Sequence, residues 1–180
     1  DFMWKFWPPR GVVLFFLLLP AGIQAQITDQ DIFLQAEGLW AENRLEPALE
    51  RYRVVVDRNP ASPLAPTAAW KIALGEIRLS RPEKALASLN QALNRYPQLE
   101  NAQTRFWKAF LQLELKDVDQ GIRGLEALWD NAEEIGPDYF YHLARARGLS
   151  GRWEEAIQAM ETFRKKKGPS YLDTPSLSSF

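Results

Sequence analysis

The apolar positions of the chain recur in blocks along most of its length. A small residue stands at 48, 85, 121 and 156, at intervals of 37, 36 and 35 residues, and an alanine lies twelve residues before each one. Apolar side chains follow four and seven positions later, which is the spacing of one helix face. The small residues are Ala48, Ala85, Gly121 and Ala156; the alanines are Ala36, Ala73, Ala109 and Ala144; the apolar pairs are Tyr52 and Val55, Leu89 and Ala92, Leu125 and Leu128, and Met160 and Phe163. Self-similarity at this period predicts an array of helical repeats.

Start and stop signals divide the array into eight helices. We expect them at 29–42, 46–58, 63–79, 82–95, 102–115, 118–132, 137–149 and 153–166. Thr28 is expected to cap the first helix, and two pairs, Ser80 with Glu83 and Asp117 with Gln120, have the spacing of a capping box. Ser62-Pro63 and Gly136-Pro137 each place a proline at a helix start. Small residues twelve apart fall on two neighbouring helices and let them approach closely, so the helices should pair as antiparallel hairpins.

This pattern resembles the tetratricopeptide repeat, a helix–turn–helix unit of about 34 residues. The resemblance covers residues 28–168 and predicts an all-α, right-handed α-solenoid of four hairpins, at about 29–62, 66–99, 102–135 and 137–169. The units depart from the family by being one to three residues longer. The large aromatic residue that the family has early in its first helix is replaced in three of the four units, at Ile32, Ala69 and Arg105, and is present as Phe140. A different helical-hairpin array is the alternative.

In this family the first helix of each hairpin faces the inner, concave surface. The resemblance therefore implies a partner-binding wall made of Phe33, Trp40, Trp70, Lys71, Arg78, Phe106, Trp107, Phe110, Tyr141, His142 and Arg145. Aromatic and arginine side chains are typical of binding hot spots, and such a groove suits a peptide or a partner's helix. The alternative for Phe33, Trp70 and Phe106 is burial between repeats. Trp129 and Trp153 lie on the second helices, and we expect both to serve packing.

The two ends of the chain differ from the array. Residues 1–25 are expected to be a secretory signal, read from Met3, with two basic residues before an apolar run at 12–19 and small residues leading to Ala25. The run is shorter than the roughly 20 residues that span a bilayer, so no stable span is expected after cleavage; an uncleaved anchor is the alternative. Residues 26–169 form the array, and residues 170–180, rich in Ser, Pro and Thr, are expected to be disordered.

Composition limits the chemistry. The chain has no cysteine, which excludes thiol catalysis, and removal of residues 1–25 leaves a net charge of about −2, which gives no field for nucleic acid. His142 is the only histidine and has no serine at helical spacing, so a Ser–His pair for general acid–base catalysis is missing. We therefore expect no enzyme, no cofactor, no metal site and no small-molecule substrate.

These observations favour a periplasmic adaptor of the bacterial envelope that binds proteins or peptide segments in its aromatic groove. The chain is similar to the repeat domains of the Tol-Pal-associated cell-division coordinator and of outer-membrane assembly factors. A second hypothesis is a permanent structural subunit of an envelope machine, such as an outer-membrane assembly, motor, pilus or secretion apparatus. A third is self-association through the exposed face of the last helix, at Trp153, Ile157 and Met160.

Overall fold

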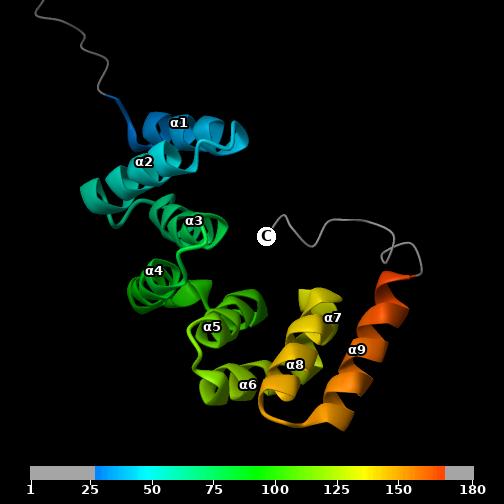
Figure 1. Cartoon of the computed structure of the whole chain (residues 1–180). Coiled ribbons are helices and arrows are strands. Elements are labelled where there is room, and N and C mark those ends of the chain that lie inside the picture. Colours follow the sequence, from blue (N-terminus) through cyan, green and yellow to red (C-terminus); the bar gives the residue numbers. More distant parts are fainter. Residues whose placement is uncertain (1–26, 169–180) are drawn as a thin grey trace, which may run out of the picture.

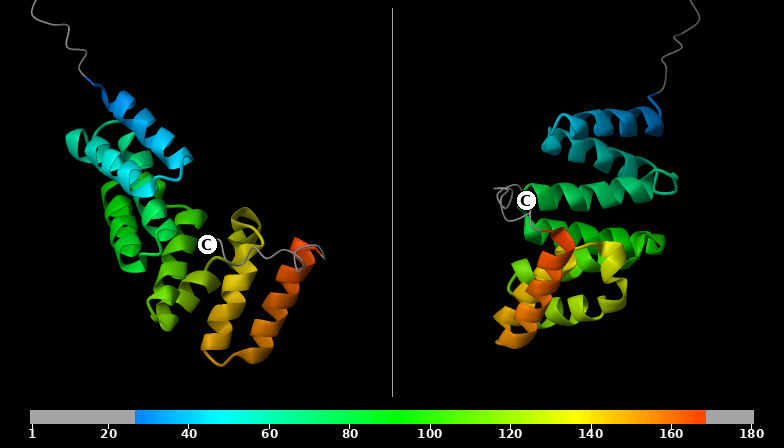
Figure 2. Two further views of the ribbon diagram at one scale, coloured as in Figure 1. Left: turned by 45° about the horizontal axis from the view of Figure 1, so that its top comes forward. Right: turned by 90° about the vertical axis from the view of Figure 1, so that its right-hand side faces the viewer.

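The computed structural model describes residues 27–168, and within this range every regular element is a helix. Four antiparallel hairpins, α1–α2, α3–α4, α5–α6 and α8–α9, stack side by side into a curved array (Figures 1 and 2). We number them repeats 1 to 4. The helices are α1 Asp29–Ala41, α2 Leu45–Arg58, α3 Ala65–Arg78, α4 Pro82–Arg95, α5 Ala102–Glu114, α6 Val118–Glu126, α7 Ala132–Ile135, α8 Asp138–Leu149 and α9 Trp153–Lys167, with 3-10 turns at Pro97–Leu99 and Trp129–Asn131. The predicted α-solenoid is confirmed. The expected signal at 1–25 and the expected tail at 170–180 both lie outside the described range.

The predicted small residues form the seams of the hairpins. All four alanines of the inner helices and two of the four small residues of the outer helices are at least 96 % buried: Ala36, Ala73, Ala109, Ala144, Ala48 and Ala85. Repeat 3 has two glycines at its seam. A Cβ atom at Gly121 would lie 2.6 Å from the Leu113 side chain, and one at Gly124 would lie 2.8 Å from the Cβ of Ala109. Two glycines opposite one alanine therefore bring α5 and α6 closer together than side chains at these positions would allow.

The helix starts follow local capping chemistry. Thr28 caps α1 as predicted and also forms a capping box with Asp31, and the Asp117 side chain accepts a hydrogen bond from the Gln120 amide. A second box, Asn101 with Thr104, was not predicted. The prediction for Ser80 is wrong, because Ser80 has a φ of 56° as the turn residue after α3, and α4 begins after Arg81 without a side-chain cap.

The expected helix at 118–132 ends early, at Glu126. The carbonyl of Leu125 accepts hydrogen bonds from the Leu128 amide at 3.0 Å and from the Tyr139 hydroxyl at 2.8 Å. Both lone pairs of this oxygen are then used, and the Trp129 amide has no α-helical partner. The chain continues as a 3-10 turn and the short α7 before α8 begins. The described range therefore holds nine α-helices, where the sequence predicted eight.

The buried apolar residues divide into two main clusters. One fills repeats 1 and 2 and includes Leu49 and Tyr52; the other fills repeats 3 and 4 and includes Leu125 and Tyr139. A smaller cluster between them contains four fully buried residues: Ala73, Ala85, Leu89 and Leu111. Leu111 is the only member of this small cluster that comes from repeat 3. The two halves of the array are thus held together by little buried apolar surface.

Ion pairs cross the contact between repeats 1 and 2, which we call the first joint. Glu76 on α3 is 2 % exposed, and its Oε1 atom accepts a hydrogen bond of 2.6 Å from Arg53 on α2. Its Oε2 atom lies 3.7 Å from Arg81, which in turn contacts Glu46 at 2.8 Å. A carboxylate buried to this degree needs such cationic partners. These side chains connect α2, α3 and α4.

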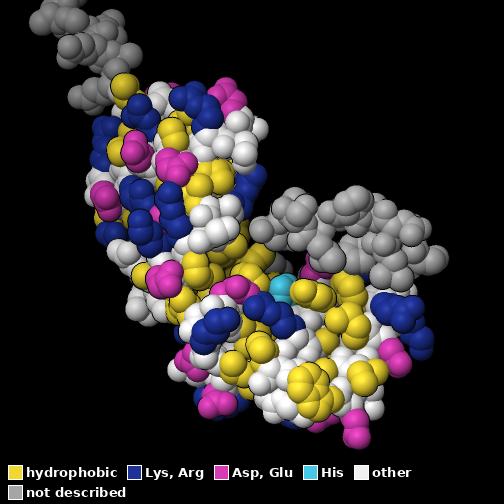
Figure 3. Space-filling model, viewed as in Figure 1, with side chains coloured by type: hydrophobic (Ala, Val, Ile, Leu, Met, Phe, Trp, Pro, Cys, Tyr) yellow, Lys and Arg dark blue, Asp and Glu magenta, His cyan; other side chains and the backbone are white. Residues whose placement is uncertain are grey.

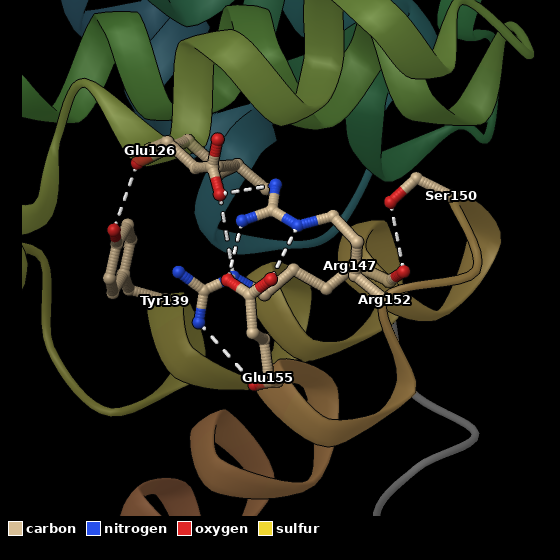
Figure 4. Close-up of polar contacts among 7 residues, drawn as sticks. Glu126, Tyr139, Arg147, Ser150, Arg152 and Glu155 are labelled. Carbon is tan, nitrogen blue, oxygen red and sulfur yellow. Dashed lines mark hydrogen bonds and ion pairs between the residues drawn. The ribbon is translucent and has the colours of Figure 1, made fainter.

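The contact between repeats 3 and 4, the last joint, carries a network of the opposite polarity (Figure 4). Arg147 on α8 lies 3.5 Å from Glu126 on α6 and 3.8 Å from Glu155 on α9. Arg152, which precedes α9, lies 2.7 Å from Glu126 and also pairs with Glu155. The hydrogen bond from Arg152 holds the pKa of the Glu155 carboxyl below its ordinary value. An arginine here takes the central place that Glu76 has in the first joint.

Candidate functional site

The inner wall of the array is formed by α1, α3, α5 and α8, which lie on the inside of the curve in Figure 1. The space-filling view shows a hollow between the first two repeats and the last two, with hydrophobic side chains gathered in it (Figure 3). Ten of the eleven predicted site residues keep part of their side chain accessible: Phe33, Trp40, Trp70, Lys71, Arg78, Trp107, Phe110, Tyr141, His142 and Arg145. Phe106 is the exception.

In the first half of the wall, two cations cover the Trp40 ring. The Lys71 Nζ atom and the Arg78 Cζ atom each lie 4.9 Å from the ring centroid, within the range of a cation–π contact. Lys71 also lies 3.1 Å from the Glu37 carboxylate, and Arg78 donates a hydrogen bond of 2.9 Å to Asn43. The aromatic surface of repeat 1 is therefore occupied by polar neighbours from the chain itself.

Phe33 adds its ring to the same region. It lies 5.6 Å from the buried Tyr52 ring, which also contacts Trp40 at 6.2 Å. The Tyr52 hydroxyl donates to Glu37, and burial together with this carboxylate raises the pKa of Tyr52. Phe33 and Trp40 pack against the core of repeats 1 and 2, so part of each ring serves stability.

In the second half of the wall, aromatic rings contact one another without a cation over them. Trp107 and Phe110 on α5 lie 5.5 Å apart, and Phe110 lies 4.9 Å from the His142 ring on α8. His142 continues the chain of edge-to-face contacts to Tyr141 at 5.1 Å, and Tyr141 reaches Phe163 on α9 at 5.7 Å. Such contacts fix the rings relative to one another. We call Trp107, Phe110, Tyr141 and His142 the aromatic cluster.

His142 belongs to this cluster as a neutral ring. Burial lowers its pKa to about 4, and the nearby Arg145 guanidinium acts in the same direction. Its Nδ1 atom is buried and has no hydrogen-bond partner among the described residues. Arg145 itself pairs with the Glu114 carboxylate, so the charges at the edge of the cluster cancel. At neutral pH the cluster therefore presents an uncharged surface.

Trp70 lies on α3, between the two halves of the wall. It packs against the small buried cluster around Leu111, and so do Trp107 and Phe110 from α5. The structure thus brings Trp70, Trp107 and Phe110 to the contact between repeats 2 and 3. Two members of the aromatic cluster, Trp107 and Phe110, therefore also take part in the contact between repeats 2 and 3.

Three aromatic residues depart from their sequence interpretation. Phe106 is 4 % exposed and belongs to the core of repeats 3 and 4, because it points between α5 and the following repeat. Trp129 is 53 % exposed and Trp153 is 67 % exposed, so neither is a packing residue as predicted. Trp129 stands on the 3-10 turn that replaced the end of the expected helix, and Trp153 starts α9, the last helix among the described residues.

Two further findings concern the chemistry of the described part. Within residues 27–168, no group of three His, Cys, Asp or Glu side chains is placed to hold a metal ion. In the same range, no helix combines the length and apolar character that crossing a membrane requires.

Comparison with protein families identifies two segments of the chain. Residues 67–98 and 138–166 match the family model of the tetratricopeptide repeat. These segments cover most of repeat 2 and most of repeat 4. No curated protein matches the chain.

Solved structures share the fold at low sequence identity. A tetratricopeptide repeat protein from Parabacteroides merdae is 16 % identical with a TM-score of 0.62; the match covers 83 % of this chain and 55 % of that one, little more than half its length. The 41-end form of MamA from Desulfovibrio magneticus is 12 % identical, with a TM-score of 0.66 and coverage of 79 % and 77 %. BtubC (BKLC) from P. vanneervenii is 16 % identical, with a TM-score of 0.63 and coverage of 84 % and 68 %.

Proposed function

Since two segments of this chain are tetratricopeptide repeats and its described part folds as a tetratricopeptide repeat solenoid, we propose that it is a scaffold that binds a protein partner through the aromatic cluster. Solenoids present extended concave surfaces, and these are the surfaces with which they bind. The proposal assigns binding to the inner face of α5 and α8. It assigns no catalysis to the chain.

The observation that carries the proposal is the difference between the two halves of the wall. Trp40 is covered by Lys71 and Arg78 of the same chain, whereas the rings of Trp107, Phe110 and Tyr141 stay partly accessible with no cation over them. Grouped aromatic side chains on a concave surface supply large contact area at low entropic cost. The second half of the wall is therefore the better binding surface.

The charges of the wall indicate the chemistry of the partner. Lys71 pairs with Glu37, and Arg145 pairs with Glu114. A partner that used an acidic group to bind Lys71 or Arg145 would have to displace an existing carboxylate. An extended or helical peptide segment with apolar and aromatic side chains fits this surface without that cost.

A random-peptide display screen against the full chain tests this assignment. We expect selected peptides to be rich in apolar and aromatic residues, and to lose at least tenfold in affinity when Trp107 and Phe110 are both replaced by Ala. Losses of this size, about 1.4 kcal/mol or more, are usual for aromatic hot spots. Circular dichroism should show that the variant keeps its helicity, because both rings are only partly buried.

The matched control is Val54→Ala, an exposed apolar position on the outer helix α2. Peptides that bind the Trp107→Ala/Phe110→Ala variant as tightly as the wild type would contradict the proposal. A variant that loses its helices would instead assign both rings to the core. In that case the single variant Tyr141→Ser replaces the double variant in the binding test, since Tyr141 lies at the edge of the cluster away from the middle of the array.

We further propose that the scaffold works in a bacterial envelope, after export. The support is the leader-like pattern of residues 3–25, with its basic start, apolar run and small residues before Ala25. Fractionation of a bacterial host with a C-terminal tag tests this: the shortened chain should appear in the periplasm. A full-length product in the cytosol contradicts export and leaves the binding assignment untouched.

A further inference from the structure

The last helix, α9, carries an apolar stripe whose outer side no described helix covers. Figures 1 and 2 show α8 against one side of α9 and no described helix against the other. Trp153 is 67 % exposed and Ile157 is 60 % exposed. Met160, which is partly buried against the core of repeats 3 and 4, and the exposed Arg164 follow at helical spacing, so the four residues form one stripe along the helix.

The order of residues in this stripe is suited to pairing with its own reverse. The steps from Trp153 to Ile157, Met160 and Arg164 are four, three and four residues, which read the same in both directions. In an antiparallel pair of α9 helices, Ile157 of one copy lies opposite Met160 of the second copy. Trp153 then lies opposite Arg164 of the second copy, which is the arrangement of a cation–π contact.

The charged residues beside the stripe repeat the same steps about a centre one residue later. Glu154, Gln158, Glu161 and Lys165 are spaced by four, three and four residues, and all are exposed. In the antiparallel pair, Glu154 lies two residues, about 3 Å along the axis, from the level of Lys165 of the second copy. This offset is within reach of the lysine side chain, and the contact occurs twice. A parallel pair would place Glu154 against Glu154 and Lys165 against Lys165.

The charged residues beside the stripe form no ion pairs within the described chain. Glu155, Lys166 and Lys167 on the same helix form ion pairs with neighbours on other elements. Glu154, Glu161, Arg164 and Lys165 form none among the described residues. The unpaired carboxylates lie in the first two-thirds of α9 and the unpaired cations near its end, so the helix is complementary to an antiparallel copy of itself.

We propose that the chain forms a two-fold dimer through antiparallel contact of its α9 helices. This goes beyond the binding function of the inner wall, which stays open in such a dimer because α9 lies at the end of the array. A helix of 15 residues is roughly 22 Å long, so the interface is small and the dimer dissociates on dilution.

Sedimentation velocity of the full chain over a wide concentration range tests the dimer. The wild type should shift from monomer to dimer as its concentration rises. Ile157→Glu should raise the dissociation constant at least tenfold, because it places a carboxylate in the centre of the apolar contact. The matched control is Leu34→Glu, an equally exposed leucine on α1, which should dimerise like the wild type.

A charge exchange tests the antiparallel arrangement itself. Glu154→Lys should weaken the dimer about threefold to tenfold, since it faces Lys165 of the second copy. Adding Lys165→Glu to the same chain restores both contacts and should restore the affinity. A parallel dimer shows no such rescue, because like charges face each other there in every combination.

Three results would overturn the proposal. The first is a monomer at every concentration, as expected if residues 169–180 or a different protein cover the stripe. The second is dissociation by Leu34→Glu, which indicates a head-to-tail contact between α1 and α9. The third is a Glu154→Lys/Lys165→Glu variant as weak as the single variant.

Discussion

The joints between successive repeats differ in how charged side chains cross them. In the first joint a buried Glu76 lies between Arg53 and Arg81, and in the last joint Arg147 and Arg152 lie against Glu126 and Glu155. The contact between repeats 2 and 3, which we call the middle joint, has no such network. Within residues 65–126, all of them described, no ion pair or side-chain hydrogen bond joins α3 or α4 to α5 or α6.

The difference can be traced to three positions of the repeat. In the first and last joints, all three positions are charged. The first position lies five residues after the small residue of the outer helix. The second lies three residues after the alanine of the next inner helix, and the third lies four residues before the small residue of the next outer helix. They are Arg53, Glu76 and Arg81 in the first joint and Glu126, Arg147 and Arg152 in the last. In the middle joint the same positions hold Asn90, Gln112 and Asp117. Gln112 bonds to Gln120 within its own repeat, and Asp117 caps α6.

This comparison predicts that the array consists of two stable halves with a weaker contact between them. Each half has its own large core and its own ionic network, while the middle joint depends on the small cluster around Leu111. In a solenoid, each repeat is stabilised mainly by its neighbours, so a weak joint limits the cooperativity of the whole. The aromatic cluster lies directly beside this joint, through Trp107 and Phe110.

The largest effect is expected from Leu111→Ala. Removal of this buried side chain should cost about 2–5 kcal/mol of stability and uncouple the halves, so that unfolding splits into two transitions. Denaturant unfolding followed by circular dichroism and by tryptophan fluorescence measures this. Leu125→Ala is the control, because it leaves a similar cavity inside one half. Coincident transitions in Leu111→Ala would show that the middle joint is not the weak one.

Acid is expected to loosen the second half before the first. The unfolded chain protonates His142 near pH 6.5, whereas the folded protein keeps it neutral down to about pH 4. Between these values the unfolded state binds more protons than the folded state. The free energy of unfolding therefore decreases as the pH is lowered, by up to roughly 3 kcal/mol. His142→Phe should remove this part of the pH dependence. Chemical denaturation at pH 7 and pH 4.5 tests it; an unchanged difference between the two pH values would contradict the burial of a neutral His142.

Removal of the Glu76 carboxylate from the first joint should cause a smaller loss of stability. Glu76→Ala leaves Arg53 and Arg81 without their shared partner, and both are partly exposed, so we expect a loss of about 2 kcal/mol. Gln112→Ala, at the equivalent position of the middle joint, should cost under about 0.5 kcal/mol, as surface substitutions usually do. Equal losses in thermal unfolding would mean that the ionic network contributes no stability.

The smallest effect comes from building the missing network. Asn90→Glu with Gln112→Arg copies two positions of the last joint into the middle one, next to the existing Asp117. We expect a gain of roughly 0.3–1 kcal/mol for the pair and none for either single variant, as measured by a double-mutant cycle. A pair that is merely additive would show that these positions do not meet across the middle joint.

Much of this architecture could be predicted from the sequence because its causes are local. Small residues such as Ala73 and Ala109 recur at fixed steps, and helix packing needs them there. The early end of α6 was not predictable in this way, because it depends on the Tyr139 hydroxyl, fourteen residues beyond the carbonyl that it contacts. Trp153 is exposed because no helix among residues 27–168 covers it, and the period of the sequence does not reveal this.

The candidate site was predicted only in part, because sequence patterns show local spacing but not contacts between distant residues. The resemblance placed Trp107, Phe110 and Tyr141 on the inner wall, and the helices that carry them, α5 and α8, lie on the inside of the curve. It did not show that Lys71 and Arg78 would cover Trp40, because those contacts join residues 31 and 38 positions apart. The register of Glu76 and Arg147 was visible in the sequence, yet only the structure showed that each meets partners from two other helices.

Fluorine NMR of the full chain labelled with fluorotryptophan tests the central claim most directly. Trp40, Trp70, Trp107, Trp129 and Trp153 sample the inner wall, the middle joint and the outer surface, and single substitutions assign their signals. On addition of a peptide selected by display, we predict a shift of the Trp107 signal, with the Trp129 and Trp153 signals unchanged. A bound peptide that moves Trp129 or Trp153 and leaves Trp107 in place would contradict binding at the aromatic cluster.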